Sequence, residues 1–179
     1  MMNNDFWELM FKEQGAFWEF APSGSSILVA GIIEKNGINK VLIPGVGYGR
    51  NTKPFIESGF DVSGIEISKS AIKLARKYGL TFPIHLGSVL DMPFVSTLYD
   101  GIFCYSLLHL FNKRERFQIL KNCYNQLDNN GVMVFVVVSV KAEMYGTGKL
   151  LSKNRFKIDN GLNVFFYESK AIETEFRKF

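Results

Sequence analysis

The sequence is poor in cysteine and histidine, with only two residues of each type. Cys104 and Cys123 stand in a chain of 179 residues that is 47% hydrophobic, so a core can form without disulfides. A reducing, cytoplasmic compartment fits this cysteine usage. No cluster of His, Cys, Asp or Glu shows the spacing of a metal site, so we expect no bound metal.

Long apolar runs are missing as well. The longest, 132–138, is far shorter than the roughly 20 residues that a membrane-spanning helix needs. The N-terminus carries Asp5 and Glu8 and lacks the basic and apolar segments of a signal peptide. The formal charge is only +4, and its densest basic group, within 149–157, is short, which argues against a nucleic-acid partner. We therefore expect a soluble protein with no membrane association.

Short apolar runs alternate with helical patterns along the chain. Strands are predicted at 40–43, 60–67, 82–86, 101–105 and 132–138, and helices at 4–13, 27–34, 50–58, 69–78, 113–127 and 169–179. Ser25 or Ser26, Ser68 and Ser169 are the expected N-caps. The alternation predicts one α/β domain over 1–179, with a doubly wound, mostly parallel sheet covered on both faces.

The segment 141–167 breaks the alternation. Asn160-Gly161 lies between two strand-like stretches, 154–159 and 162–167, and this dipeptide is typical of a tight hairpin. Insertions after the fifth strand lie near the carboxyl ends of the strands. The segment is therefore expected to cover the substrate side of a site at that edge.

The most informative stretch is a glycine-rich turn directly after the first strand. Val41-Leu42-Ile43 leads into Pro44-Gly45-Val46-Gly47-Tyr48-Gly49, and a helix follows. Glycines allow positive φ and close approach of the backbone to a ligand, and a helix N-terminus favours anions. The spacing is G-x-G-x-G, with Arg50 where a dinucleotide fingerprint has its third glycine. This disfavours NAD but leaves a dinucleotide-dependent oxidoreductase as an alternative.

Glu66 stands at the end of the second predicted strand. A carboxylate there can accept both ribose hydroxyls of an adenosine held where the strand order of the sheet reverses. The alternative is that Glu66 is a surface or helix-capping residue. This alternative is less favoured because the glycine turn precedes Glu66 at the spacing that ribose binding requires.

Together these motifs resemble the class I S-adenosylmethionine-dependent methyltransferases over 38–140, which is then the cofactor-binding core. The likeness extends to 86–94, similar to the loop that receives adenine, and to 99–106, similar to the fourth motif of that family. It implies a Rossmann-like fold, S-adenosyl-L-methionine as cofactor, and transfer of its methyl group. That family usually adds two more strands, so the sheet is expected either to be a minimal one or to belong to a fragment.

The resemblance assigns roles residue by residue. It places Gly45 and Gly47 against the methionine part, and Glu66 on the ribose. The full cofactor set that it implies is Gly45, Gly47, Gly49, Glu66, Ile67, Ser88, Val89, Cys104 and Tyr105. Two positions depart from the common pattern: Ile43 and Ser88 stand where many members carry an acidic residue.

A narrower likeness concerns the N-terminal segment. Trp7-Glu8, Trp18 and Gly49-Arg50-Asn51 are similar to small-molecule methyltransferases of the thiopurine and tellurite-resistance type. In those enzymes the segment before the first core helix folds over the cofactor, so residues 1–36 are expected to form a helical lid. The alternative is an N-terminal helix that is simply packed on the domain.

The expected acceptor is a small molecule. The fourth motif lacks the patterns associated with methylation of DNA bases, and the expected acceptor pocket consists of Trp18, Phe20, Tyr105 and His109. His109 is the candidate general base and Tyr105 a candidate for orienting the acceptor, although either can be a packing residue. A cofactor-binding but catalytically inactive interaction domain remains a further alternative, because of Ile43 and the early end of the chain.

Overall fold

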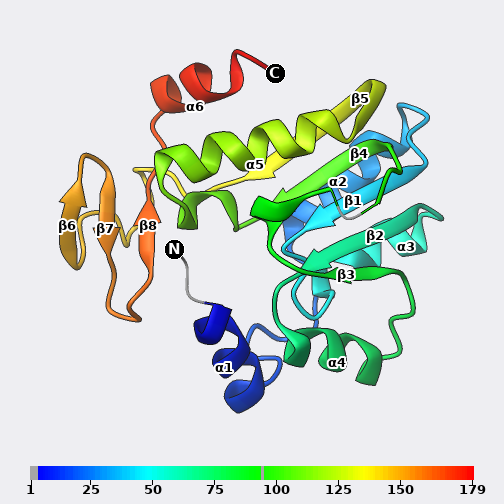
Figure 1. Cartoon of the computed structure of the whole chain (residues 1–179), viewed down its shortest axis with the longest axis horizontal. Helices are drawn as coiled ribbons and strands as arrows, with labels where there is room; N and C mark the ends of the chain where they lie inside the picture. Colours follow the sequence, from blue (N-terminus) through cyan, green and yellow to red (C-terminus); the bar gives the residue numbers. More distant parts are fainter. Residues whose placement is uncertain (1–3, 94) are drawn as a thin grey trace.

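The computed structural model describes residues 4–93 and 95–179 (Figure 1). Its centre is a five-stranded parallel sheet with the order β3-β2-β1-β4-β5. The strands are Lys40–Pro44 (β1), Asp61–Glu66 (β2), Ile84–Leu86 (β3), Tyr99–Tyr105 (β4) and Leu127–Val136 (β5). The strand order reverses between β1 and β4, so the predicted doubly wound, parallel α/β fold is confirmed.

Both faces of the sheet are buried because the apolar side chains of its strands alternate between two cores. Val41 and Ile43 of β1 join Val29 and Phe55 in one cluster, whereas Leu42 belongs to the other. The helices are Asn4–Gln14 (α1), Gly24–Glu34 (α2), Lys53–Glu57 (α3), Lys69–Lys77 (α4), Lys113–Asn125 (α5) and Ser169–Phe176 (α6). Helices α2 and α3 supply the first core and α5 the second, as parallel sheets require.

Capping side chains explain where the main helices begin. The predicted Ser68 accepts a hydrogen bond from the Ala71 N–H and starts α4. Two other expected caps are wrong by one to three positions. Ser23, not Ser25 or Ser26, caps α2, and Glu168 precedes α6 without a side-chain bond.

Two element boundaries differ from the sequence prediction. The helix expected at 50–58 divides into a 3₁₀ turn, Arg50–Thr52 (η1), and α3, which has a proline in its first turn. Strand β5 starts five residues earlier than expected and includes the predicted turn around Asn130, whose φ is 65°. The extra length is absorbed where the register with β4 shifts between Tyr99 and Gly101.

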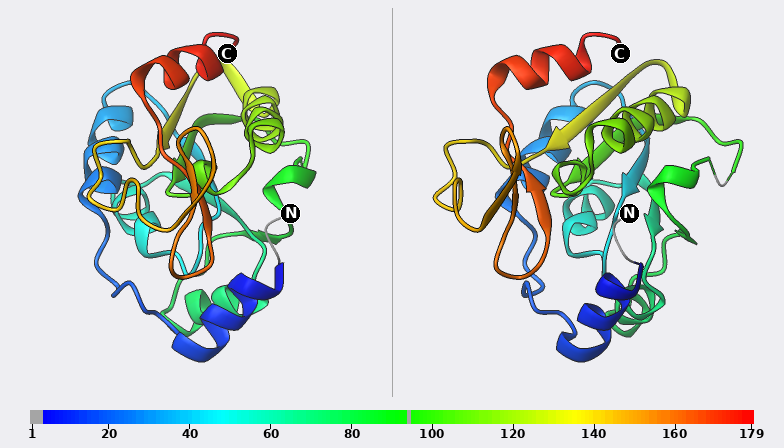
Figure 2. Two further views of the ribbon diagram at one scale, coloured as in Figure 1. Left: turned by 90° about the vertical axis from the view of Figure 1, so that its left-hand side faces the viewer. Right: turned by 60° about the vertical axis from the view of Figure 1, so that its left-hand side comes forward.

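A small antiparallel sheet follows β5 and lies beyond the carboxyl ends of the parallel strands (Figures 1 and 2). The predicted hairpin forms Arg155–Lys157 (β7) and Asn163–Phe165 (β8), which are shorter than expected. Lys149–Ser152 (β6), which the sequence did not predict, pairs with β7. One bridge, between Ser139 and Tyr167, connects the ends of this insertion.

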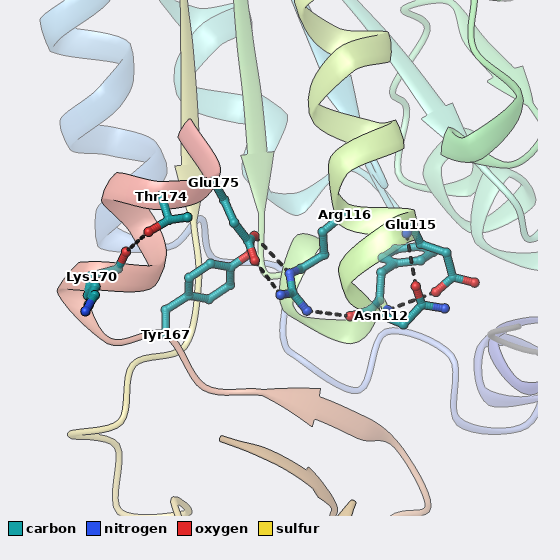
Figure 3. Close-up of polar contacts among 8 residues, drawn as sticks. Asn112, Glu115, Arg116, Tyr167, Lys170, Thr174 and Glu175 are labelled. Atoms are coloured by element: carbon teal, nitrogen blue, oxygen red, sulfur yellow. Dashed lines mark hydrogen bonds and ion pairs between the residues drawn. The ribbon is translucent and has the colours of Figure 1, made fainter. Parts of the chain in front are cut away.

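A buried ion pair attaches α6 to α5 (Figure 3). Arg116 of α5 is 2% exposed, and its guanidinium donates to both carboxylate oxygens of Glu175 and to the Phe111 carbonyl. The Tyr167 hydroxyl donates to the same carboxylate, and the Phe165 ring lies 3.9 Å from the guanidinium carbon. The C-terminal helix and the small sheet are thereby connected to the central domain.

In the described part of the chain, no helix combines the length and the apolarity that crossing a membrane requires.

Candidate functional site

A cavity of about 620 Å³ opens at the carboxyl ends of the parallel strands. Residues from the ends of β1, β2 and β4 line it, including Gly45, Glu66 and Tyr105. The cavity therefore lies where the strand order reverses, which is the position at which doubly wound sheets bind ligands. Its volume suits a ligand of nucleoside size.

The glycine turn forms one wall of the cavity. β1 ends at Pro44, and the amides of Gly45 and Val46 both donate to the Ile65 carbonyl, which folds the turn against β2. Gly45 and Gly47 have φ values of 67° and 59°, a region that side chains disfavour. A Cβ on Gly45 would lie 2.8 Å from the end of the Leu107 side chain, so a substitution there adds a required shift of Leu107 to the strain of the positive φ.

Glu66 is held beside this turn by backbone amides. Its Oε2 accepts from Gly47 N–H at 2.8 Å, and Oε1 accepts from the amides of Ile67 and Ser68 at 2.9 Å. The side chain is 5% exposed, and burial raises the pKa of the carboxyl although the three N–H donors oppose that shift. The predicted convergence of the glycine turn and Glu66 at one place is thus present in the geometry.

The N-terminal segment adds an aromatic wall through Trp7 and Phe11 of α1 and through Trp18. Glu8 fixes α1 to α4: its carboxylate accepts from the hydroxyls of Ser68 and Ser70, each at 2.7 Å, and from the Ser70 amide. These bonds lower the pKa of Glu8 to about 2. A carboxylate at the N-terminus of α4 also interacts favourably with the helix dipole.

His109 also lines the cavity, from the 3₁₀ turn Leu108–Leu110 (η3) that follows β4. It is 9% exposed, and burial lowers its pKa to about 4, so the imidazole is neutral at pH 7. Its Nδ1 is buried with no hydrogen-bond partner; among the described residues, only Trp7 Nε1 shares that condition. Both unpartnered nitrogens belong to residues that line this cavity.

Most of the residues expected at the site line this one cavity. They are Trp18, Gly45, Gly47, Glu66, Ile67, Ser88, Val89, Tyr105 and His109. Gly49, Phe20 and Cys104, which were also expected at the site, are not among the residues that line this cavity. Phe20 instead stacks near Tyr48, and Cys104 is fully buried in β4, where burial raises the pKa of its thiol to about 12.

Sequence reasoning missed a second group of lining residues. It includes Trp7, Phe11, Tyr48, Arg50, Asp91, Leu107 and Leu162. Trp7 and Phe11 have the i, i+4 spacing of one helix face, so the sequence carried a signal that they share a surface. The resemblance implied a lid over residues 1–36 but did not say which face of the N-terminal helix borders the cavity.

A parallel, doubly wound sheet with a ligand-sized cavity at its reversal point defines the class of α/β proteins that bind their ligands at the carboxyl ends of the strands. Residues 41–131, about half of the chain, match the family model described as methyltransferase domain. The chain therefore belongs to this family, and the resemblance to class I S-adenosylmethionine-dependent methyltransferases is confirmed.

Two curated relatives illustrate the sequence similarity. An uncharacterized methyltransferase of Oceanobacillus iheyensis is 30% identical over 103 residues, 58% of this chain and 48% of the relative. A glycine/sarcosine N-methyltransferase of Halorhodospira halochloris is 25% identical over 166 residues, 80% of this chain and 60% of the relative. The chain thus spans about half of the length of these relatives.

Solved structures share the fold. The CcbJ methyltransferase of Streptomyces caelestis aligns with a TM-score of 0.72 at 16% identity, covering 96% of this chain and 83% of that one. The 1,6-didemethyltoxoflavin-N1-methyltransferase of Burkholderia thailandensis, crystallised with its substrate and S-adenosylhomocysteine, aligns with a TM-score of 0.71 at 17% identity. It covers 98% of this chain and 74% of that one.

Proposed function

We propose that the protein binds S-adenosyl-L-methionine in the cavity at the strand ends and transfers its methyl group to a small-molecule acceptor. One observation carries this proposal: Gly47 N–H and the Glu66 carboxylate meet at 2.8 Å on the cavity wall, within the segment that matches the methyltransferase domain. The relatives named above, which include N-methyltransferases acting on small molecules, support the choice of acceptor class.

The residues present fit the adenosyl group. Three backbone N–H donors use three of the roughly four lone-pair positions of the Glu66 carboxylate, so one acceptor position remains for a ribose hydroxyl. Ile67 offers an apolar side chain to the adenine, and Ser88 and Val89 lie at the same end of the cavity. Gly45 and Gly47 permit the close approach that the methionine part requires, and Arg50 is the lining cation that can face its carboxylate.

When bound, S-adenosylmethionine supplies a methyl group already activated by a positively charged sulfur. The protein's own contribution is to align donor and acceptor, which can lower the barrier by about 7–11 kcal/mol. Apolar walls from Trp7, Phe11 and Leu107 exclude water from that region. Methyl transfer therefore needs no catalytic triad here, and Tyr105, at the end of β4, is placed to orient the acceptor.

Calorimetric titration with S-adenosylhomocysteine and with NAD, side by side, tests the cofactor. We expect binding of the first and none of the second, and Glu66→Ala should weaken binding at least about tenfold, or 1.4 kcal/mol. Asp61→Ala, at the exposed opposite end of β2, is the matched control and should bind normally. Unchanged affinity of Glu66→Ala would remove Glu66 from the site.

The same samples separate the alternative functions. Tighter binding of NAD would favour an oxidoreductase. Binding of S-adenosylhomocysteine without transfer of labelled methyl to any member of an acceptor panel would favour an inactive binding domain.

A further inference from the structure

The charged groups of the cavity are distributed unevenly. Among the lining residues that the structure describes, the charged ones are Arg50, Glu66 and Asp91. Arg50 and Asp91 follow β1 and β3, and Glu66 is the last residue of β2, so all three lie on the side proposed to hold the cofactor. Whatever lies on the other side of the cavity therefore meets no charged side chain from these strands.

The wall that follows β4 and β5 is uncharged throughout the described residues. It consists of Tyr105, Ser106, Leu107, His109, Leu110, Phe111, Val138, Met144, Ile158, Asn160, Leu162 and Val164. Its outer part comes from the β7–β8 hairpin, whose Ile158 and Val164 are themselves buried. A carboxylate or ammonium group placed here would lose its hydration without gaining an ionic partner, which is strongly unfavourable.

His109 is the polar group of this wall whose environment most restricts its role. Its Nδ1 has almost no accessible surface and no hydrogen-bond partner, whereas Nε2 is not among the buried nitrogens that lack a partner. A buried N–H without an acceptor is rarer than an unpaired acceptor, so the favoured tautomer carries its proton on Nε2. An imidazolium would bury an additional unpaired N–H, and the low pKa of about 4 is consistent with that cost.

We infer that the methyl acceptor is an uncharged, largely apolar molecule, and that His109 holds it as a neutral hydrogen-bond donor through Nε2 and not as a general base. The inference rests on the proposed function. Without a base in this wall, the acceptor atom must have a lone pair that is nucleophilic before deprotonation, as a neutral amine or ring nitrogen has. That lone pair forms the new bond to the methyl carbon while the carbon–sulfur bond breaks and its electron pair stays on sulfur. A proton on the acceptor nitrogen then leaves to water.

Binding of matched probes to the protein saturated with S-adenosylhomocysteine tests the acceptor class. Quinazolinone is an uncharged bicyclic ring with ring nitrogens and a carbonyl, and its carboxylate derivative adds one negative charge. We expect quinazolinone to bind at least about tenfold more tightly than the carboxylate, by calorimetry at pH 7.5. Equal or tighter binding of the carboxylate, or no binding of quinazolinone, overturns the inference. Failure of S-adenosylhomocysteine to bind is seen in the first titration and counts against the proposed function instead.

A charge inserted into the wall should change this preference. Leu162→Lys places an ammonium in the uncharged side of the cavity and should reduce or reverse the preference for quinazolinone. Leu150→Lys, on β6 at a position that is 62% exposed and outside the lining, is the matched control and should keep the wild-type preference. An unchanged preference in Leu162→Lys, with the cofactor product still bound, contradicts the assignment of this wall to the acceptor.

Two substitutions test the donor role of His109. His109→Gln keeps an N–H donor at a similar reach, and His109→Leu removes it. We expect His109→Leu to bind quinazolinone about tenfold more weakly than the wild type does. Its affinity for quinazoline, which lacks the carbonyl, should stay within about twofold of the wild-type value. His109→Gln should retain most of the wild-type difference in affinity between the two probes. Equal weakening of both probes in His109→Leu would mean a packing role and would overturn the donor assignment.

Discussion

Gly47 has a positive φ of 59° and occupies an open position on the cavity wall. The nearest side-chain atom to a Cβ at this position is Phe11 Cζ, at 3.7 Å, so an alanine fits sterically but points toward the ligand space. Gly37 has a similar φ of 69° with nothing within 4 Å. We expect Gly47→Ala and Gly37→Ala each to lose about 1–2 kcal/mol of stability.

Only Gly47→Ala should also weaken binding of S-adenosylhomocysteine. Urea unfolding measures the shared effect, and calorimetry the specific one. Equal binding by the two variants would show that Gly47 is needed for the turn alone.

His109 makes stability depend on pH in a predictable direction. Its pKa is about 4 in the folded protein against 6.5 for the unperturbed group, so the unfolded chain binds more protons between these values. Stability is therefore retained above pH 6.5 and is lost as the pH falls toward 4. At pH 5 the loss from this residue is about 2 kcal/mol relative to pH 7.5.

The comparison of His109→Gln with the wild type isolates this contribution, because the other titrating groups are common to both. The wild-type free energy of unfolding, measured in urea at pH 7.5 and 5, should fall by about 2 kcal/mol more than that of His109→Gln. A parallel fall in both proteins would exclude a buried, neutral imidazole at this position.

At the scale of single residues, the sequence predicted the groups whose chemistry depends on spacing. The glycine turn and Glu66 are fixed by their positions at strand ends, and the parallel sheet brings those ends to one edge. Cys104 and Phe20 lie outside the cavity lining, which the sequence could not show, because a strand position alone does not say which face its side chain occupies and a loop aromatic has several possible partners. The Phe20 ring packs against the rings of Tyr48 and Tyr78.

Among the elements, α1 depends on one carboxylate for its position over the cavity. Glu8→Gln keeps the size of the side chain but removes its negative charge. The hydroxyls of Ser68 and Ser70 and the Ser70 amide stabilise that charge. We expect hydrogen exchange in α1 to accelerate by about tenfold or more, because local opening becomes easier. Glu13→Gln, exposed on the same helix, is the control and should leave exchange unchanged. Identical exchange in both variants would mean that aromatic packing alone holds α1.

The contact between α5 and α6 rests on a pair that is costly to break (Figure 3). Arg116→Met leaves the partly buried Glu175 carboxylate with the hydrogen bond from the Tyr167 hydroxyl but without its cation, and should destabilise the protein by roughly 3 kcal/mol in urea unfolding. Arg116→Met combined with Glu175→Leu should be less destabilising than the single change, since no unpaired charge remains. A double variant that loses the sum of both single effects would contradict this account.

Element types followed from periodicity, and element limits did not. β1 and β4 read as buried strands because both of their faces are covered. β6 was not predicted because it is an edge strand in the described sheet, paired with β7, and its Leu150 and Leu151 are exposed, so no alternation of buried and exposed residues marks it. The start of β5 was missed because the strand continues through a register shift: Leu127 pairs with Tyr99 and Val132 with Gly101, and Asn130 keeps its left-handed φ between these two pairs.

At the scale of the whole molecule, three separate parts of the chain form one cavity. The strand ends carry Glu66, α1 carries Trp7, and the β7–β8 hairpin carries Leu162. A ligand that contacts all three must stabilise the assembled state over any state in which α1 or the hairpin has opened. Binding therefore couples these parts through a shared contact, in addition to the contacts that α1 makes through Glu8 with α4 and that the hairpin makes through Ile158 and Val164 with the core.

This coupling gives a prediction that differs from general stabilisation. S-adenosylhomocysteine at 100 times its dissociation constant should raise the free energy of unfolding by about 2.7 kcal/mol, whatever the geometry of the site. If the cavity is closed by α1 over the cofactor, amide exchange in α1 should slow on binding as much as exchange in β1 and β2, whereas the exposed strand β6 should not respond. Glu66→Ala should reduce both effects at the same ligand concentration, because an affinity tenfold weaker lowers the stabilisation to about 1.4 kcal/mol. Slower exchange at the strand ends without any change in α1 would place the cofactor product in the cavity but deny the N-terminal segment its role as a lid, because a segment that gains no protection makes no contact that the ligand strengthens.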